Sequence, residues 1–237
     1  MKTPLRRKTV TLTQFAMLLA IEALVCFTPL GSLPAVGPIV ATLAMVPVII
    51  TAILLGTGAG AYMGAFAGLF SFLVWTFTPP NPLVAFVFTP FYTLGTTRGN
   101  VWSLVICFVP RILVGVVAGM CFNLFTRLRW KSGIVYGLSG ALGSLANTFG
   151  VLGGIYVFFG HSYATVLGKG FNLLLGLIGL TILTSGIPEA IIGGVAAYAV
   201  CRPIQKNMKH DLDQGLEHLV VDGAGRTIQK HTNHDAD

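Results

Sequence analysis

This sequence contains little charge for its length. Only 10% of its 237 residues are Asp, Glu, Lys or Arg, whereas 54% are hydrophobic, and the mean hydropathy is +0.79. A soluble domain carries roughly 25% charged residues, so this chain has too few polar groups to cover a surface in water. The composition excludes a soluble globular domain and predicts a polytopic membrane protein that is solvated by lipid.

Acidic residues are especially scarce before the last part of the chain. Residues 1–210 hold 13 Lys and Arg against two acids, Glu22 and Glu189, which gives a net charge of +11. Residues 211–237 hold two basic and six acidic residues, a net charge of −4. We therefore predict a transmembrane domain over 1–210 and an acidic cytosolic tail over 211–237, disordered because it is polar and lacks apolar periodicity.

Motifs for catalysis and metal binding are also missing. The sequence has no GxxxxGK[ST], HExxH or GxSxG motif. The absence of the first excludes ATP hydrolysis by a P-loop, and the absence of the other two argues against an intramembrane hydrolase. His161 has no second His or Cys at ligand spacing, and the cysteines lack CxxC spacing. We expect no enzymatic activity, no cofactor or metal on this chain, and no nucleic-acid partner, since the basic residues cluster at segment ends.

Apolar segments long enough to cross a bilayer recur along the first 200 residues. A spanning helix needs about 20 mostly apolar residues. The pattern predicts an all-α membrane protein with six transmembrane helices, at about Leu12–Cys26, Ile39–Leu55, Ala59–Phe77, Cys107–Phe125, Gly133–Phe159 and Thr181–Val200.

The basic residues orient these six helices. If the count is right, ten basic residues fall on one side of the membrane, in the N-terminal segment, in the turn after the fourth helix and after the sixth helix, and the positive-inside rule assigns that side to the cytoplasm. Both termini are therefore predicted to be cytoplasmic. The ten residues are Lys2, Arg6, Arg7, Lys8, Arg127, Arg129, Lys131, Arg202, Lys206 and Lys209.

Three ionisable residues lie inside the predicted helices: Glu22, Arg111 and Glu189. A charge at mid-bilayer costs roughly 2.5–3.5 kcal/mol on insertion scales, so such residues pair or face a cavity. We expect all three in the outer half of the membrane, with Pro110 in the first turn of the fourth helix. Two roles stay open for Arg111: an ion pair with a glutamate, or a fork of hydrogen bonds to an anionic ligand.

Asn147 is the deepest uncharged polar residue, in "SLANTFGVLGGIY". For a lone Asn in a membrane helix, an interhelical hydrogen bond is the commoner role and a ligand contact the rarer one. Trp75 fits an interfacial belt first and a stacking group second.

Several stretches, taken in order, resemble one family. They are "FAMLLAIEAL", "LAMVPVIITAILLGTGAGAYMGAFAGLFSFL", "ICFVPRILVGVVAGMCFNLF", "GSLANTFGVLGGIYVFFG" and "IPEAIIGGVAAYAV". Together they cover most of residues 10–205 and resemble the substrate-binding (S) components of bacterial energy-coupling factor (ECF) vitamin transporters. The "FVPRIL" and "SLANT" stretches are most similar to the pantothenate-type members.

The resemblance implies a six-helix fold and a vitamin site near the outer face, closed by loops at about Phe27–Pro38 and Pro79–Asn100. It implies a membrane-embedded coupling (T) subunit and two cytosolic ATPases as partners, which use the ATP. It also implies that Ala16 and Ala20, an AxxxA pattern, form a docking face for the T subunit. Together with the polar residues at the outer side, it gives these candidate substrate-binding residues: Arg111, Asn147, Arg98, Lys169, Trp75, Asn81, Tyr156 and Glu189.

The leading hypothesis is therefore capture of a vitamin, pantothenate, whose single carboxylate gives Arg111 a partner. Arg98 and Lys169 are alternative partners for that carboxylate. One alternative function is an S component for another vitamin, such as riboflavin or folate. Another is a stand-alone secondary transporter, which the lack of a clear inverted repeat weighs against.

Overall fold

A computed structural model describes residues 4–28, 32–33, 41–95, 97–168 and 170–207. The described chain is mostly helical, as the composition predicts. It divides into a compact unit, Met1–Cys201, and a second unit that begins at Arg202. The predicted acidic tail at 211–237 lies outside the described residues, as does Lys169.

Five helices in the described residues are long and apolar enough to cross a membrane, by length and composition. The last of them is a single helical run that contains α6 (Phe171–Thr181) and a π-helical turn, η3 (Ile182–Gly186). The five are α1 (Pro4–Phe27), α3 (Thr57–Phe77), α4 (Val101–Arg127), α5 (Ser132–Val166) and the run Phe171–Asn207.

The second predicted span is shorter in the structure than in the sequence analysis. Helix α2 covers Met45–Leu55, only 11 residues. At about 1.5 Å per residue it is roughly 16 Å long, about half of the hydrocarbon thickness of a bilayer. Residues 39–40 of the predicted span lie outside the described residues. A strand, β2 (Ala41–Thr42), pairs antiparallel with β1 (Ser32–Leu33) just before α2, a local element that the all-α prediction does not contain.

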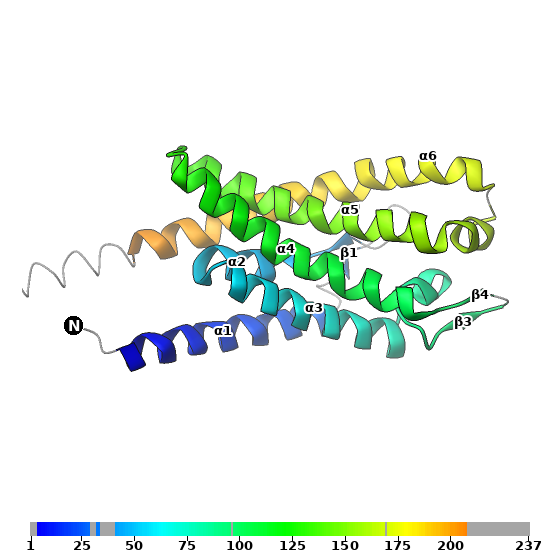
Figure 1. The fold of residues 1–237 in the computed structure, drawn as a ribbon, viewed down its shortest axis with the longest axis horizontal. Helices are drawn as coiled ribbons and strands as arrows, with labels where there is room; N and C mark the ends of the chain where they lie inside the picture. The colour runs from blue at the N-terminus through cyan, green and yellow to red at the C-terminus, as the bar shows by residue number, and fades with distance from the viewer. Residues whose placement is uncertain (1–3, 29–31, 34–40, 96, 169, 208–237) are drawn as a thin grey trace, which may run out of the picture. The chain divides into compact units, whose positions relative to one another are not determined.

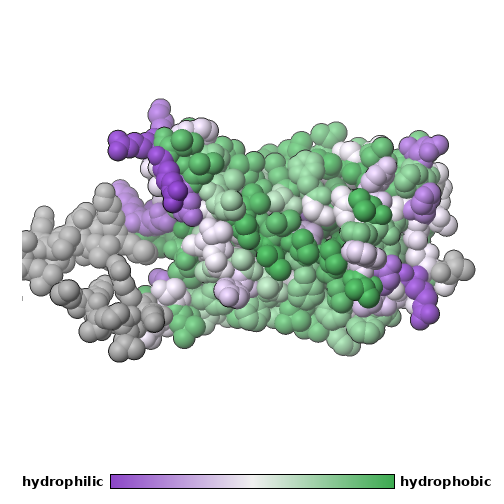
Figure 2. Space-filling model, viewed as in Figure 1, coloured by the Kyte–Doolittle hydropathy of each residue, from purple (hydrophilic) through white to green (hydrophobic). Residues whose placement is uncertain are grey.

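Within the unit that ends at Cys201, α3, α4, α5 and the helix that begins with α6 alternate in direction, and α1 runs in the same direction as α3 (Figure 1). The start of α1 and the α4–α5 turn lie toward one end, and the connection from α5 to α6 lies toward the other. In Figure 2 the sides of the helices are largely hydrophobic, and strongly hydrophilic residues gather at the two ends. Large apolar side chains such as Leu12, Val157 and Ile191 are more than 60% exposed, which suits contact with lipid rather than water.

Helix α4 begins earlier than predicted, and this changes the role of Pro110. The side chain of Asn100 accepts a hydrogen bond from the backbone N–H of Trp102, and Ser103 completes a capping box, so the helix starts at Val101. The prediction that Pro110 lies in the first turn is therefore wrong: it lies inside the helix. Its ring faces α5, where a Cβ on Gly150 would lie 3.0 Å from the proline Cβ.

The long segment between α3 and α4 is folded back into the bundle. It contains a 3₁₀ helix, η2 (Pro82–Val87), and a small hairpin of β3 (Thr93–Leu94) and β4 (Thr97–Arg98). Residues 84–89 are at most 2% exposed. The Ser103 hydroxyl donates to the carbonyl of Phe86 at 2.8 Å, and the hydroxyls of Thr76 and Thr89 are 2.8 Å apart. These bonds fix the segment against α3 and α4.

Glycines allow α3 and α4 to approach closely. A Cβ on Gly64 would collide with the backbone carbonyl of Arg111 and lie 2.8 Å from Cα of Ile112. A Cβ on Gly115 would likewise collide with the carbonyl of Gly60. Small residues at this spacing permit backbone contact between membrane helices. The contact fixes the backbone from which the Arg111 side chain projects.

This contact gives the first testable prediction. Gly64→Ala should destabilise the purified protein by about 1–3 kcal/mol, because the added methyl group has no space against α4. Gly58→Ala is the matched control: it lies in the same helix, and a Cβ there would meet nothing within 4 Å. Thermal unfolding in detergent measures both. A Gly64→Ala protein as stable as the control would contradict close α3–α4 packing.

Candidate functional site

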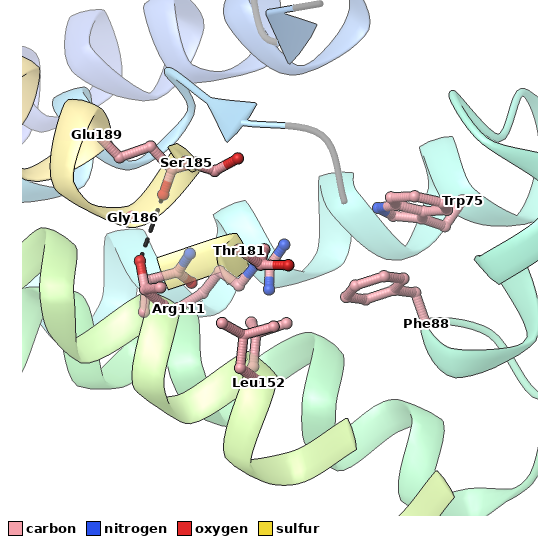
Figure 3. Close-up of a pocket in the computed structure, with 11 residues that line it drawn as sticks. Trp75, Phe88, Arg111, Leu152, Thr181, Ser185, Gly186 and Glu189 are labelled. Atoms are coloured by element: carbon pink, nitrogen blue, oxygen red, sulfur yellow. Dashed lines mark hydrogen bonds between the residues drawn. The ribbon is translucent and has the colours of Figure 1, made fainter. Parts of the chain in front are cut away.

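A pocket opens between α3, α4, α5 and the helical run Phe171–Asn207 (Figure 3). It contains about 480 Å³ of space between atoms, with open solvent at its mouth included. Its lining combines apolar and aromatic side chains with a few polar groups, which is typical of a small-molecule site. Its lining residues are Trp75, Phe88, Arg111, Asn147, Thr148, Val151, Leu152, Thr181, Ser185, Gly186 and Glu189.

Arg111 is the one positively charged residue among those that line the pocket. Its Nη2 donates a hydrogen bond to the hydroxyl of Ser71 on α3 at 3.3 Å. Its Nη1 is buried and has no hydrogen-bond partner among the described residues. A buried guanidinium nitrogen without an acceptor is costly, so Nη1 offers a strong binding site for an anionic oxygen.

Two stacked aromatic rings border the arginine. The rings of Trp75 and Phe88 are 4.4 Å apart between centroids, with 23° between their planes. The guanidinium carbon of Arg111 lies 5.8 Å from the Phe88 ring centroid, within cation–π range. In Figure 3 the two rings lie side by side, apart from Ser185 and Glu189. The aromatic pair therefore gives the pocket an apolar wall next to its positive charge.

The polar side of the pocket is formed by α5 and the last helical run. Oε2 of Glu189 accepts a hydrogen bond from the Thr148 hydroxyl at 3.4 Å, drawn as the dashed line in Figure 3. The same hydroxyl lies 3.4 Å from the carbonyl of Ser144. The amide of Asn147 lies one residue before Thr148 and also lines the pocket. These groups offer both acceptors and donors to the hydroxyls or amides of a ligand.

The π-helical turn η3 brings backbone and hydroxyl groups to this wall. Pro188 follows the turn by two residues and has no N–H, so a regular helical hydrogen bond to the preceding turn is not available. π-Turns inside α-helices often occur at functional sites. A Cβ on Gly186 would lie 2.8 Å from Cγ2 of Thr148, so glycine is required for this close approach of the turn to α5.

Four of the eight predicted substrate-binding residues meet in this pocket: Arg111, Asn147, Trp75 and Glu189. Asn81, Arg98 and Tyr156 do not line it. The side chain of Asn81 caps η2, Arg98 is exposed in β4, and the ring of Tyr156 stacks on Phe171. Lys169 lies outside the described residues.

Sequence reasoning did not select Phe88, Thr148, Thr181 or Ser185, which also line the pocket. Phe88 lies in a segment that the sequence analysis treats as a loop, although the apolar run "LVAFVF" is a signal of burial. The hydroxyl residues carry no such signal, because Thr and Ser are common inside membrane helices. Thr181, for example, satisfies its hydroxyl on the carbonyl of Leu177.

The third intramembrane ionisable residue, Glu22, lies outside the pocket lining. It is fully buried in α1. Oε1 accepts a hydrogen bond from the Cys26 thiol at 3.3 Å, whereas Oε2 has no hydrogen-bond partner among the described residues. Glu22 and Arg111 thus do not share a direct hydrogen bond.

Helix α1 presents two small residues on the side opposite to Glu22. Ala16 and Ala20 are both exposed, next to Met17, which is 64% exposed. The inward side of α1 packs on α3, where the rings of Phe15 and Phe66 are 6.4 Å apart between centroids. The predicted docking alanines are therefore accessible to another membrane protein.

Comparisons with known proteins identify the family of this chain. The family model described as "ECF transporter, substrate-specific component" matches residues 10–204. The chain is 34% identical over 171 residues to the pantothenic acid transporter PanT of Lactococcus lactis subsp. cremoris, covering 71% of this chain and 80% of that protein. It is 31% identical over 195 residues to the pantothenate transporter PanT of Leuconostoc mesenteroides, covering 79% and 87%.

The family match covers all the residues that line the pocket and most of each of the five long helices. Both relatives are named as transporters, and the apolar helices are those of a multi-pass protein. The chain therefore belongs to the substrate-specific components of ECF transporters, in the bacterial cell membrane.

Proposed function

We propose that this chain captures pantothenate from outside the cell and delivers it with an ECF module. The observation that carries the proposal is the buried Nη1 of Arg111, which has no hydrogen-bond partner among the described residues and belongs to a residue of the pocket wall. Pantothenate has one carboxylate, one amide and two hydroxyls. An arginine fork suits the carboxylate, and the groups of Asn147, Thr148 and Glu189 suit the amide and hydroxyls.

The proposed partners are a T subunit and two cytosolic ATPases, and ATP is used by those ATPases alone. This chain would bind no cofactor and catalyse no reaction. The family supports the partners, and the exposure of Ala16 and Ala20 supports a docking face on α1.

We also propose a six-helix S-component topology with both termini in the cytoplasm. In this topology α2 belongs to the second of the six crossings. The basic turn after α4, with Arg127, Arg129 and Lys131, supports this orientation by the positive-inside rule. It lies toward the same end of the unit as the start of α1 (Figure 1).

A vitamin panel tests the function directly. The purified protein should bind pantothenate tightly, with thermal stabilisation on addition of the vitamin. Tight binding of riboflavin or folate instead would assign the chain to another vitamin. Uptake into liposomes by this chain alone, without T subunit or ATPases, would favour a stand-alone secondary transporter.

Arg111→Gln should weaken pantothenate binding by about 10- to 150-fold, which corresponds to the roughly 1.5–3 kcal/mol of a hydrogen bond to a charged group. Isothermal titration calorimetry on the purified protein measures this change. Arg98→Gln is the matched control, because Arg98 is exposed in β4 and does not line the pocket. If Arg98→Gln loses binding and Arg111→Gln keeps it, the carboxylate site lies at the hairpin instead.

Ala16→Leu combined with Ala20→Leu should reduce vitamin uptake and co-purification with the T subunit, because two bulky side chains would break a flat helix face. Pantothenate affinity should stay unchanged. Ala199→Leu, at an exposed alanine of the last helical run, serves as the control and should leave co-purification intact. Loss of vitamin binding in the α1 variant would mean that these alanines serve internal packing.

A further inference from the structure

The pocket carries one ionisable group of each sign among its described lining residues, Arg111 and Glu189. The guanidinium carbon of Arg111 lies 5.8 Å from the centroid of the Phe88 ring, so the positive charge is next to the aromatic wall. In Figure 3 Glu189 lies apart from the rings of Trp75 and Phe88. The proposed function uses the positive charge for the ligand's carboxylate, but pantothenate has no cationic group for the negative one.

The contacts around Glu189 hold its carboxylate at the pocket wall. Its Oε2 accepts a hydrogen bond from the Thr148 hydroxyl at 3.4 Å, and a hydroxyl donor stabilises an ionised carboxylate. Thr148 itself packs closely against the turn η3, since a Cβ on Gly186 would lie 2.8 Å from its Cγ2. Gly186 precedes Glu189 by three residues, about one helical turn. The close approach of the two helices therefore fixes where the carboxylate lies.

We propose that Glu189 determines specificity: it accepts hydrogen bonds from the uncharged, hydroxylated end of the ligand and excludes a ligand that carries a second anionic group at that end. This inference rests on the proposed function, since it takes a ligand whose carboxylate binds Arg111. In pantothenate both hydroxyls lie beyond the amide, away from the carboxylate. A phosphate on the terminal hydroxyl would replace a hydrogen-bond donor by negatively charged acceptors.

Reversing the ligand in the pocket does not relieve this conflict. A ligand with an anion at each end places one anion at Arg111 and the other toward Glu189 in either orientation. Like charges repel strongly where the dielectric constant is low, and such repulsion is a common way for a site to reject a wrong ligand. The substrate class is therefore a monoanion whose other end is neutral and bears hydroxyls.

The test uses Glu189→Gln, which removes the charge and keeps the shape of the side chain. The wild type should bind pantothenate at least about 100-fold more tightly than pantothenate phosphorylated at its terminal hydroxyl. Glu189→Gln should bind the phosphorylated ligand about tenfold more tightly than the wild type does. Its affinity for pantothenate should fall by up to about tenfold, because the amide oxygen still accepts a hydrogen bond. Calorimetry on the full chain measures these affinities.

Two controls separate charge from size. Glu189→Asp keeps the charge and should still exclude the phosphorylated ligand. A sulfamate ester at the same hydroxyl is neutral and has nearly the shape of a phosphate, so its affinity should not rise in Glu189→Gln. An equal gain for the two esters would indicate a pocket that is merely looser, and no gain for the phosphate ester would mean that Glu189 does not sense ligand charge. Either result would overturn the inference.

The wild type alone decides the question if Glu189→Gln does not fold. It should bind the sulfamate ester at least about tenfold more tightly than the phosphate ester, and equal affinities would contradict the role of Glu189. The proposed function is judged separately, by the wild-type affinity for pantothenate. Tight binding of pantothenate together with equal binding of the two esters would retain that function and reject only the specificity role.

Discussion

A guanidinium group in a membrane bundle cannot lose its charge, and the arrangement of this protein follows from that constraint. Arg111 receives partial compensation from two groups: the hydroxyl of Ser71 and the ring of Phe88. Neither of these satisfies Nη1. In a medium of low dielectric constant an unsatisfied donor of this kind is costly when left alone and valuable when an anion meets it. The same feature that reduces stability therefore supplies affinity.

The position of this charge depends on backbone contacts far from any ligand. Gly64 lies directly against the carbonyl of Arg111, so the register of α3 and α4 is fixed at the residue that we propose to bind the ligand's carboxylate. On the other flank, Gly150 accommodates the ring of Pro110, and Gly186 accommodates Thr148. Each glycine removes a side chain where two helices meet beside the pocket. Packing and binding are therefore not separate properties in this bundle.

The sequence alone was sufficient to predict polar residues and turns, because these differ clearly from the apolar segments around them. Helix α3 is predicted within two residues of its start, because the glycine-rich turn "GTGAG" and the prolines after Phe77 limit it on both sides. Arg111, Asn147 and Glu189 are found for the same reason, since polar residues are conspicuous inside membrane helices. Their meeting in one pocket follows from tertiary packing.

Other features depend on contacts that local patterns do not reveal. The capping box of Asn100 and Ser103 extends α4 into what the sequence presents as a loop. The burial of Phe88 depends on long-range contacts with α3 and α4. The shortness of α2 is equally hidden, because an apolar run shows no sign of where its helix begins.

Helix α1 has a buried inner face and an exposed outer face. Glu22 follows Ala20 by two residues, a rotation of roughly 200° around an α-helix, so the buried carboxylate and the exposed alanines lie on opposite faces. The inner face of α1 therefore packs within the bundle, where Phe15 meets Phe66, and its outer face is available to the proposed T subunit.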